Sequence, residues 1–343
     1  MAKNIVGLRI GASRLAAARV ELNGSARVQQ IAESPLPAGI VAGGEVRDQA
    51  ALAAALKDFF EHHKLPRKAV RLGLASNRIG VRTIDLPGLE DAGQVENAVR
   101  FRAGEVLPIP LAEAVLDYQV LSEKMDEDGR LARRVLLVVA YRDLVQSYVQ
   151  ACQVAGLRLA GVDLEAFALL RALTPPEEPA GERSAMVAVA IGSERSTLAV
   201  SDGLTCEFTR VLEWGGSALT AALARSLNVD HEEAERLKRE IGLEEEGADA
   251  KAVEALRVGL QAFARELVSS LQFYQSQPDS LGIREVVLAG GAAQLQGLAP
   301  ALQRLVGVPV RIGDPCAGVA TAKRLKADPS PAFAVPIGLA LGV

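Results

Sequence analysis

The sequence predicts an α/β protein of two domains that are built on a duplicated unit. Its 343 residues exceed what one small core accommodates. A short apolar strand, a glycine turn and a second strand occur twice, at residues 5–20 and 187–200, with Gly11 and Gly192 lying 181 residues apart. Strand patterns and helix patterns also follow one another along the chain. These observations favour a mixed α/β architecture in which each domain begins with the same hairpin.

The composition excludes several classes of protein. Hydrophobic residues make up 49% of the chain and charged residues 23%, which is typical of a globular protein. The net charge of -4, without a basic stretch, argues against a nucleic-acid partner. The sequence shows no signal peptide and no membrane span, and its three isolated cysteines suit a reducing compartment. We therefore expect a cytoplasmic protein that meets a membrane only through a partner.

In the first domain, the pattern predicts a helix over 51–60 with Asp48 as its N-cap, then a strand over 69–74. From about residue 80 a separate α+β pattern begins, which we interpret as an inserted subdomain. The proline-rich stretch 174–182 is the predicted linker to the second domain. The predicted boundaries are 1–79 with 166–180 and 331–343 for the first domain, 80–165 for the inserted subdomain, and 184–330 for the second domain.

The second domain opens with the repeated hairpin. Ser217 is predicted to cap a helix over 218–227, so that free N–H groups at its start face an anion. Apolar residues at steps of three and four predict one long amphipathic helix over 253–274. A strand over 285–288 then leads through two glycines to a helix predicted over 295–305, and a last helix is predicted over 333–341.

The two glycine turns are the candidate functional elements. Glycine permits a positive φ and lets an anion approach the backbone N–H groups closely. Two facing turns of this kind could hold the phosphates of one nucleotide. The alternative is that both are ordinary hairpin turns and that no nucleotide binds. The adjacent residues His62 and His63 have no acidic or cysteine partner nearby in sequence, so no metal site is predicted.

With these turns and the late glycine pair, the chain resembles the actin-like ATPase fold, a duplicated ribonuclease H-like fold shared by FtsA, MreB, actin and Hsp70. Within that superfamily it looks like the PilM family of type IV pilus assembly proteins. The resemblance is carried by residues 7–13 (GLRIGAS), 162–170 (VDLEAFALL), 234–238 (AERLK), 289–291 (AGG) and 333–341 (FAVPIGLAL).

The resemblance implies that ATP or ADP binds between the two domains. It assigns each part of the nucleotide to a group of residues. These are Gly11 and Ser13 for the first phosphate loop, Gly192 and Ser193 for the second, Gly215 and Gly216 for the cleft wall, Glu235 and Lys238 for ribose and base, and Gly290 and Gly291 under the adenine.

The sequence departs from the family pattern at the catalytic positions. Arg9 and Ala190 stand where members of the superfamily carry acidic residues that hold hydrated Mg²⁺ and orient water, and Ala16 replaces the usual lysine. We therefore assign no catalytic residue and no metal ligand, and expect no ATP hydrolysis. Two interpretations of Arg9 remain open: it replaces Mg²⁺ as a phosphate partner, or it closes the cleft by pairing with a local carboxylate.

The function that the resemblance implies is a cytoplasmic scaffold of the type IV pilus inner-membrane platform. Such a scaffold would bind the N-terminal cytoplasmic peptide of PilN in a groove between the first domain and the inserted subdomain, and act through PilN on PilO. One alternative is an active ATPase whose domains close on Mg·ATP. Another is a cytoplasmic GspL-like component of type II secretion, although GspL continues into a membrane span and this sequence ends at Val343.

Overall fold

The computed structural model describes residues 3–87, 92–106, 110–125, 131–174, 183–243, 249–278, 280–323, 325 and 329–342. It divides into two compact units, each described here by itself. Unit 1 comprises Met1–Ala75 with Cys152–Val343, and unit 2 is Ser76–Ala151. The predicted boundaries of the inserted subdomain, 80 and 165, remain predictions; residues 159–164 form a strand of unit 1. Most of the predicted linker, residues 175–182, lies outside the described residues.

The first sheet of unit 1 has six strands. In spatial order they are β10 (Leu159–Leu164), β6 (Val70–Leu74), β1 (Lys3–Ile10), β2 (Arg14–Asn23), β3 (Ser25–Pro35) and β16 (Ala320–Thr321). Strands β1, β2 and β3 are antiparallel, and β6 and β10 add in parallel beside β1. Helix α1 (Gln49–His62) follows; the Asp48 side chain accepts a hydrogen bond from the Ala51 N–H at 2.9 Å, which confirms the predicted cap.

The second sheet repeats the order β3, β2, β1, β6, β10 found in the first sheet. Its five strands are β13 (Cys206–Leu212), β12 (Ser196–Ser201), β11 (Ala185–Ile191), β14 (Ile283–Ala289) and β15 (Val310–Ile312). Ile10 lies opposite Leu15 and Ile191 lies opposite Ser196, so the 181-residue offset holds in the register of both hairpins. The predicted duplication is confirmed.

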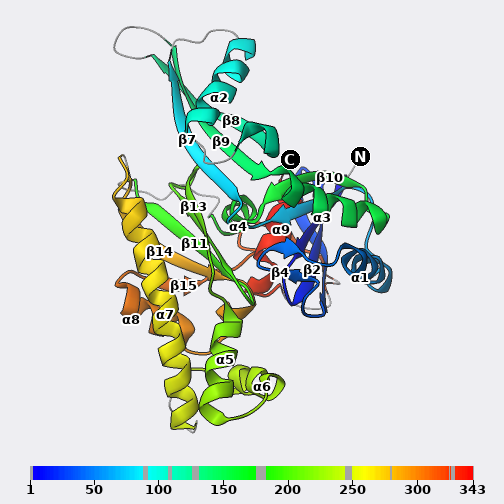
Figure 1. Ribbon diagram of the computed structural model, residues 1–343, viewed down its shortest axis with the longest axis vertical. Helices are drawn as coiled ribbons and strands as arrows, with labels where there is room; N and C mark the ends of the chain where they lie inside the picture. Colours follow the sequence, from blue (N-terminus) through cyan, green and yellow to red (C-terminus); the bar gives the residue numbers. More distant parts are fainter. Residues whose placement is uncertain are drawn as a thin grey trace. The chain divides into compact units, whose positions relative to one another are not determined.

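Two helices link these sheets. Helix α9 (Ala334–Leu341) contacts β1, β2 and β6 of the first sheet, and α4 (Glu165–Leu173) contacts α9 as well as β11 and β12 of the second (Figure 1). The helices approach so closely that a Cβ on Gly338 would lie 1.8 Å from the carbonyl oxygen of Ala168. A glycine is therefore required at this crossing.

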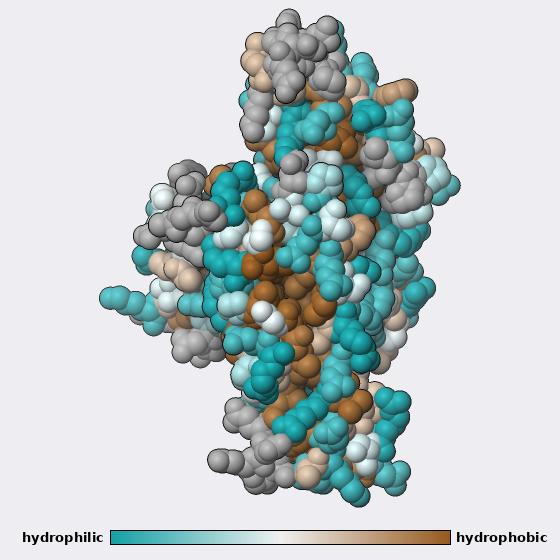
Figure 2. Space-filling view, turned by 90° about the vertical axis from the view of Figure 1, so that its left-hand side faces the viewer, coloured by the Kyte–Doolittle hydropathy of each residue, from teal (hydrophilic) through white to brown (hydrophobic). Residues whose placement is uncertain are grey.

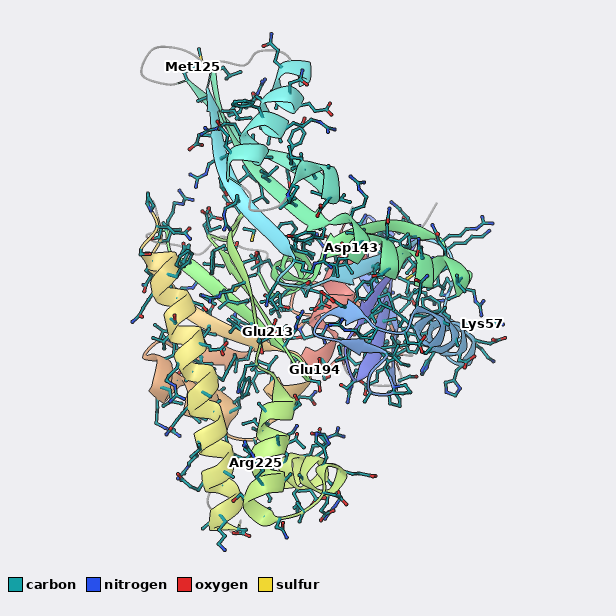
Figure 3. All side chains as sticks on the ribbon, viewed as in Figure 1. Lys57, Met125, Asp143, Glu194, Glu213 and Arg225 are labelled. Carbon is teal, nitrogen blue, oxygen red and sulfur yellow. The ribbon has the colours of Figure 1, made fainter. Side chains whose placement is uncertain are left out.

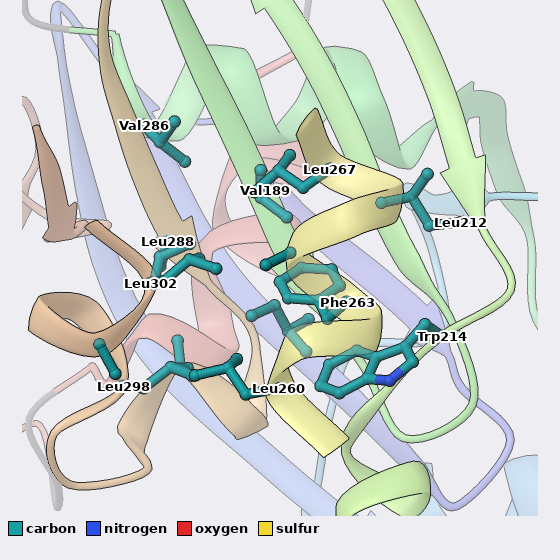
Figure 4. Close-up of a cluster of buried hydrophobic side chains, with 14 of the residues drawn as sticks. Val189, Leu212, Trp214, Leu260, Phe263, Leu267, Val286, Leu288, Leu298 and Leu302 are labelled. Atoms are coloured by element: carbon teal, nitrogen blue, oxygen red, sulfur yellow. The ribbon is translucent and has the colours of Figure 1, made fainter. Parts of the chain in front are cut away.

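Four α-helices in the described residues accompany the second sheet. They are α5 (Gly216–Leu227), α6 (His231–Ile241), α7 (Ala250–Gln275) and α8 (Leu298–Val306). Of these, α7 contacts β13 and α8 contacts β15. The long helix predicted from the apolar stripe is α7, and its Phe263 stacks on Trp214 with ring centroids 4.3 Å apart (Figure 4). The helix predicted over 295–305 starts later, because a short 3-10 turn (η2, Gly291–Gln294) comes first and Gly297, at φ +76°, is the N-cap of α8.

Apolar side chains also gather on the side of the molecule where α7 lies (Figure 2). The large exposed members on α7 are Val258 and Phe273, with 55% and 53% of their surface accessible. The rest of the stripe on α7 is buried, as in Val253, Leu256 and Leu260. Within the part of the chain that the structure describes, no helix combines the length and the apolar character needed to span a bilayer.

Unit 2 is a three-stranded antiparallel sheet with helices. Its strands, in spatial order, are β7 (Ile79–Pro87), β9 (Leu131–Tyr141) and β8 (Ala114–Met125). Its helices are α2 (Ala92–Val106), the short η1 (Leu111–Glu113) and most of α3 (Arg142–Val154). Val95 and Val99 of α2 belong to the same buried hydrophobic core as Val135 and Leu137 of β9. This core makes unit 2 a small α+β body.

Candidate functional site

The site predicted from the sequence is built around the two glycine turns. The first turn (residues 11–14) joins β1 to β2, and the second turn (residues 192–195) joins β11 to β12. The Gly11 N–H donates to the carbonyl of Arg14 at 3.0 Å, and the Gly192 N–H donates to the carbonyl of Arg195 at 2.8 Å. The two turns thus have the same hydrogen bond at equivalent positions. Their flanking strands are interior strands of the two sheets, which holds both turns in place.

Arg9 lies at the end of β1 among small residues. Its neighbours across the sheet are Ala16 on β2 and Gly73 on β6. A Cβ on Gly73 would lie 3.3 Å from Cγ of Glu165, so the missing side chain leaves room for Glu165 above β6. Arg9 Nε donates to Glu165 Oε2 at 3.0 Å, and the two side chains are only 15% and 5% exposed. Arg9 therefore pairs with a local carboxylate, the first residue of α4.

The same guanidinium also reaches the second turn. A Cβ built on Gly192 would lie 3.2 Å from Nη2 of Arg9. On the second sheet, Ala190 stands between Thr197 and Ala289 and contributes no anionic oxygen. Hydrated Mg²⁺ is bound through carboxylate oxygens, so a paired arginine and an alanine do not fit this ion. Among the described residues, no three His, Cys, Asp or Glu side chains come together as a metal-binding group.

The start of α5 corrects one prediction. The N–H groups of Gly216 and Ser217 donate to the carbonyls of Gly192 and Ser193 at 2.9 and 2.8 Å, and the Ala218 N–H donates to the Gly215 carbonyl. These donors are consumed by the backbone and do not face an anion. Ser217 is not the N-cap, because its hydroxyl donates to the Ser193 carbonyl at 2.7 Å and Gly215 precedes the helix. The second turn and α5 therefore form one hydrogen-bonded block.

Close packing explains the glycine in this block. A Cβ on Gly215 would lie 2.3 Å from the Ser193 carbonyl oxygen. A Cβ on Gly290, whose φ is +86°, would lie 2.3 Å from the Ile191 carbonyl oxygen. A Cβ on Gly291, in contrast, would meet no described atom within 4 Å, so that position is open. The structure thus brings Gly215 and Gly290 against the second turn, from two different segments of the chain.

The residues predicted to contact ribose and base are bonded to each other. Lys238 is buried, with its ammonium group donating to Glu235 Oε2 at 2.5 Å, to Thr220 Oγ1 at 2.8 Å and to the Gly216 carbonyl at 3.1 Å. All three of its donors have an acceptor. Glu235 accepts further bonds from the Thr220 hydroxyl and from Arg239. A ligand that binds the ammonium group of Lys238 must therefore displace one of these three acceptors.

This network shifts the acidity of Glu235. Partial burial raises the pKa of the carboxyl group, but the hydrogen bonds from Lys238 and Thr220 and the charge of Lys238 outweigh it and lower the pKa to about 2. Glu235 is therefore ionised at neutral pH, while burial lowers the pKa of the Lys238 ammonium group. Lys238 also ties α6 to the start of α5, so the network connects the predicted base-binding helix with the second turn.

Two residues of the site were missed from the sequence. Glu165 was named only within the stretch 162–170 that carries the family resemblance, and Thr220 was not singled out. Thr220 lies one helical turn after Gly216, and its hydroxyl donates to the Gly216 carbonyl or to Glu235. Glu165 is separated from Arg9 by 156 residues, so only the packing of α4 on the first sheet reveals the pair.

Two sheets of the same strand order, joined through a pair of packed helices and each carrying a glycine turn, define a protein of the actin-like fold. MreB5 of Spiroplasma citri bound to AMPPNP shares this fold, with a TM-score of 0.58 at 12% identity over 98% of this chain and 94% of that one. The Escherichia coli K12 cell division protein FtsA is 25% identical over 364 residues, which covers 91% of this chain and 84% of FtsA.

Residues 7–343 match the family described as type IV pilus assembly protein PilM, and the chain belongs to that family. The structure is similar to that of a PilM-PilN type IV pilus biogenesis complex. The TM-score is 0.84 at 31% identity, over 98% of this chain and 97% of that one. The recognition made from the sequence is confirmed.

Proposed function

We propose that this protein is the cytoplasmic scaffold of a type IV pilus inner-membrane platform and that it binds the N-terminal cytoplasmic peptide of PilN. The observation that carries this proposal is the match to the PilM family over residues 7–343. The similar structure is of a PilM-PilN complex. A scaffold that binds an extended peptide needs no catalytic residues. Through PilN, the protein would act on PilO and the rest of the platform.

Fluorescence anisotropy tests the partner. A labelled synthetic peptide of the N-terminal segment of PilN from the same organism is titrated with the full chain, and a peptide of the same composition in scrambled order is the control. Saturable binding of the native peptide alone, at micromolar concentration, supports the proposal. Equal binding of both peptides, or binding of neither, contradicts it.

For the cleft, we propose that it binds ATP or ADP without Mg²⁺ and does not hydrolyse ATP. The support is the geometry of the two glycine turns together with the Arg9–Glu165 ion pair. Arg9 precedes the first turn by two residues and its guanidinium lies beside Gly192 of the second, and a guanidinium can bind phosphate oxygens through paired N–H donors. It would then take over the charge role of a metal ion, while Ala190 offers no group to orient an attacking water.

Isothermal titration calorimetry with ATP and ADP, each with Mg²⁺ and with EDTA, tests this proposal. We expect binding whose affinity is the same with and without Mg²⁺, and no phosphate release over hours. Arg9→Ala is expected to weaken binding, and Arg9→Ala/Glu165→Gln controls for the effect of leaving Glu165 unpaired. Absence of heat at millimolar nucleotide, or ATP turnover that EDTA abolishes, refutes the proposal.

A further inference from the structure

The tip of a small hairpin lies against the second turn. Strands β4 (Val41–Ala42) and β5 (Glu45–Val46) pair with each other, so Gly43 and Gly44 form a two-residue turn. Their φ angles are +59° and +67°, as a type I′ turn requires. This hairpin follows β3 of the first sheet, whereas the second turn joins β11 and β12 of the second sheet. The contact therefore bridges the two halves of unit 1.

Glu194 and Arg195 of the second turn make this contact. The Gly43 N–H donates to Glu194 Oε2 at 3.1 Å. A Cβ on Gly44 would lie 2.1 Å from Nη1 of Arg195 and 2.8 Å from the carbonyl oxygen of Ala75. Gly44 is thus enclosed between the guanidinium and the end of β6. A Cβ at this position would clash with the Ala75 carbonyl and with the Arg195 guanidinium, and the positive φ of Gly44 also disfavours a side chain, so the tip would have to shift.

Arg195 is incompletely bonded in this arrangement. Its Nε donates to Glu213 Oε2 at 3.0 Å; Glu194 and Glu213 are labelled at this end of the second sheet in Figure 3. Nη1 is buried, and within the described residues no acceptor lies at hydrogen-bonding distance from it. A buried guanidinium N–H without an acceptor is unfavourable, and it binds an anionic oxygen strongly when one arrives.

The arginine of the first turn has different surroundings. Arg14 occupies the place equivalent to Arg195, 181 residues earlier, and its Nη1 donates to Glu33 Oε2 at 2.7 Å. Both of those side chains are well exposed, at 38% and 45%. The two arginines follow the same glycine turn geometry. Of the two, and within the described part of the chain, it is Arg195 that is covered by a hairpin tip and has a buried donor without an acceptor.

We propose that the Gly43–Gly44 tip is a gate over the second turn, and that Arg195 binds a phosphate group of a nucleoside di- or triphosphate once the gate has admitted it. This inference rests on the proposed nucleotide binding. The closed gate includes the exposed Gly43–Glu194 hydrogen bond, and within the described residues it leaves Nη1 of Arg195 without an acceptor, so a polyanion that binds this nitrogen shifts the tip towards its open position. Arg195 thereby couples the ligand to the position of the first-domain hairpin.

Calorimetry with ADP in EDTA tests the role of Arg195, with Arg311→Gln as the control, because Arg311 is a well-exposed arginine outside both turns and pairs with Glu285. We expect Arg195→Gln to weaken ADP binding at least tenfold and Arg311→Gln to change it less than twofold, with both variants folded by circular dichroism. Equal affinities for wild type and Arg195→Gln overturn the inference and leave the proposed nucleotide binding intact. If wild type binds no ADP, the proposed nucleotide function fails and the phosphate role of Arg195 fails with it.

Hydrogen–deuterium exchange tests the gate without nucleotide. Gly44→Ala is expected to speed exchange of the peptide that contains residues 41–47 at least fivefold, because the tip cannot seat. The control is Gly24→Ala, another hairpin glycine at positive φ (+71°) but with no atom within 4 Å of an added Cβ. Unchanged exchange of residues 41–47 in Gly44→Ala overturns the gate. In wild type, bound ADP is expected to speed exchange in the same segment, because a phosphate on Arg195 takes the place of the tip; slower exchange contradicts the gate.

Discussion

Replacing Arg9 by methionine is expected to destabilise unit 1 by about 3 kcal/mol, since removing one partner of a buried ion pair leaves an uncompensated charge. The Glu165 side chain is 5% exposed and accepts the Arg9 Nε–H at 3.0 Å, whereas the arginine side chain keeps 15% of its surface in water. Methionine retains most of the apolar contact of the arginine stem. The loss therefore reports chiefly on the stranded carboxylate, and Arg9→Met/Glu165→Gln is expected to recover more than half of it.

Two assays test this: urea denaturation measures the free energy of unfolding, and hydrogen exchange of residues 159–174, which contain Glu165, measures the local effect. A matched control is Arg14→Met, because Arg14 forms the exposed ion pair with Glu33 on the neighbouring strands and such pairs contribute about 0–1 kcal/mol. Equal effects of the two substitutions, or no recovery in the double variant, would falsify the conclusion that Arg9 and Glu165 form a buried, mutually dependent pair.

Three further predictions concern packing, the Lys238 network and pH. Gly338→Ala is expected to cost about 3 kcal/mol in thermal unfolding, because a Cβ would lie 1.8 Å from the Ala168 oxygen; Gly282→Ala, with open space around it, is expected to change stability by less than about 0.5 kcal/mol. Lys238→Met is expected to cost about 2 kcal/mol and to speed amide exchange at residues 216–220, since it removes the link between α5 and α6; unchanged exchange there contradicts this role. The folded-state pKa of Glu235 is about 2 against an ordinary value of 4.5, so its contribution is present above pH 4.5 and is lost as the pH falls from 4.5 towards 2. After allowance for partial exposure we expect about 1–2 kcal/mol, measured as a steeper loss of stability in wild type than in Glu235→Gln between pH 5 and 3; parallel curves contradict it.

Local patterns predicted much of this fold. The repeated strand, glycine and strand are visible in the sequence because hydrophobic runs and turn residues act within a few positions of one another, and the 181-residue offset reappears in the register of both hairpins. The Asp48 cap and the long helix α7 followed from rules of the same short range. The absence of acidic residues at Arg9 and Ala190 was likewise evident from the resemblance to the actin-like fold.

The partners of the site residues depended on tertiary structure. Ser217 satisfied the sequence rule for an N-cap, yet its hydroxyl bonds the Ser193 carbonyl, because the second turn supplies acceptors to the start of α5. Of the two interpretations of Arg9, the pairing with a local carboxylate is present, through a glutamate 156 residues away. The sequence by itself determined which turns, helices and charges the chain contains, because these follow from neighbouring residues. Only the folded chain decided which donors meet which acceptors, because burial brings distant segments together and makes each buried charge require a partner.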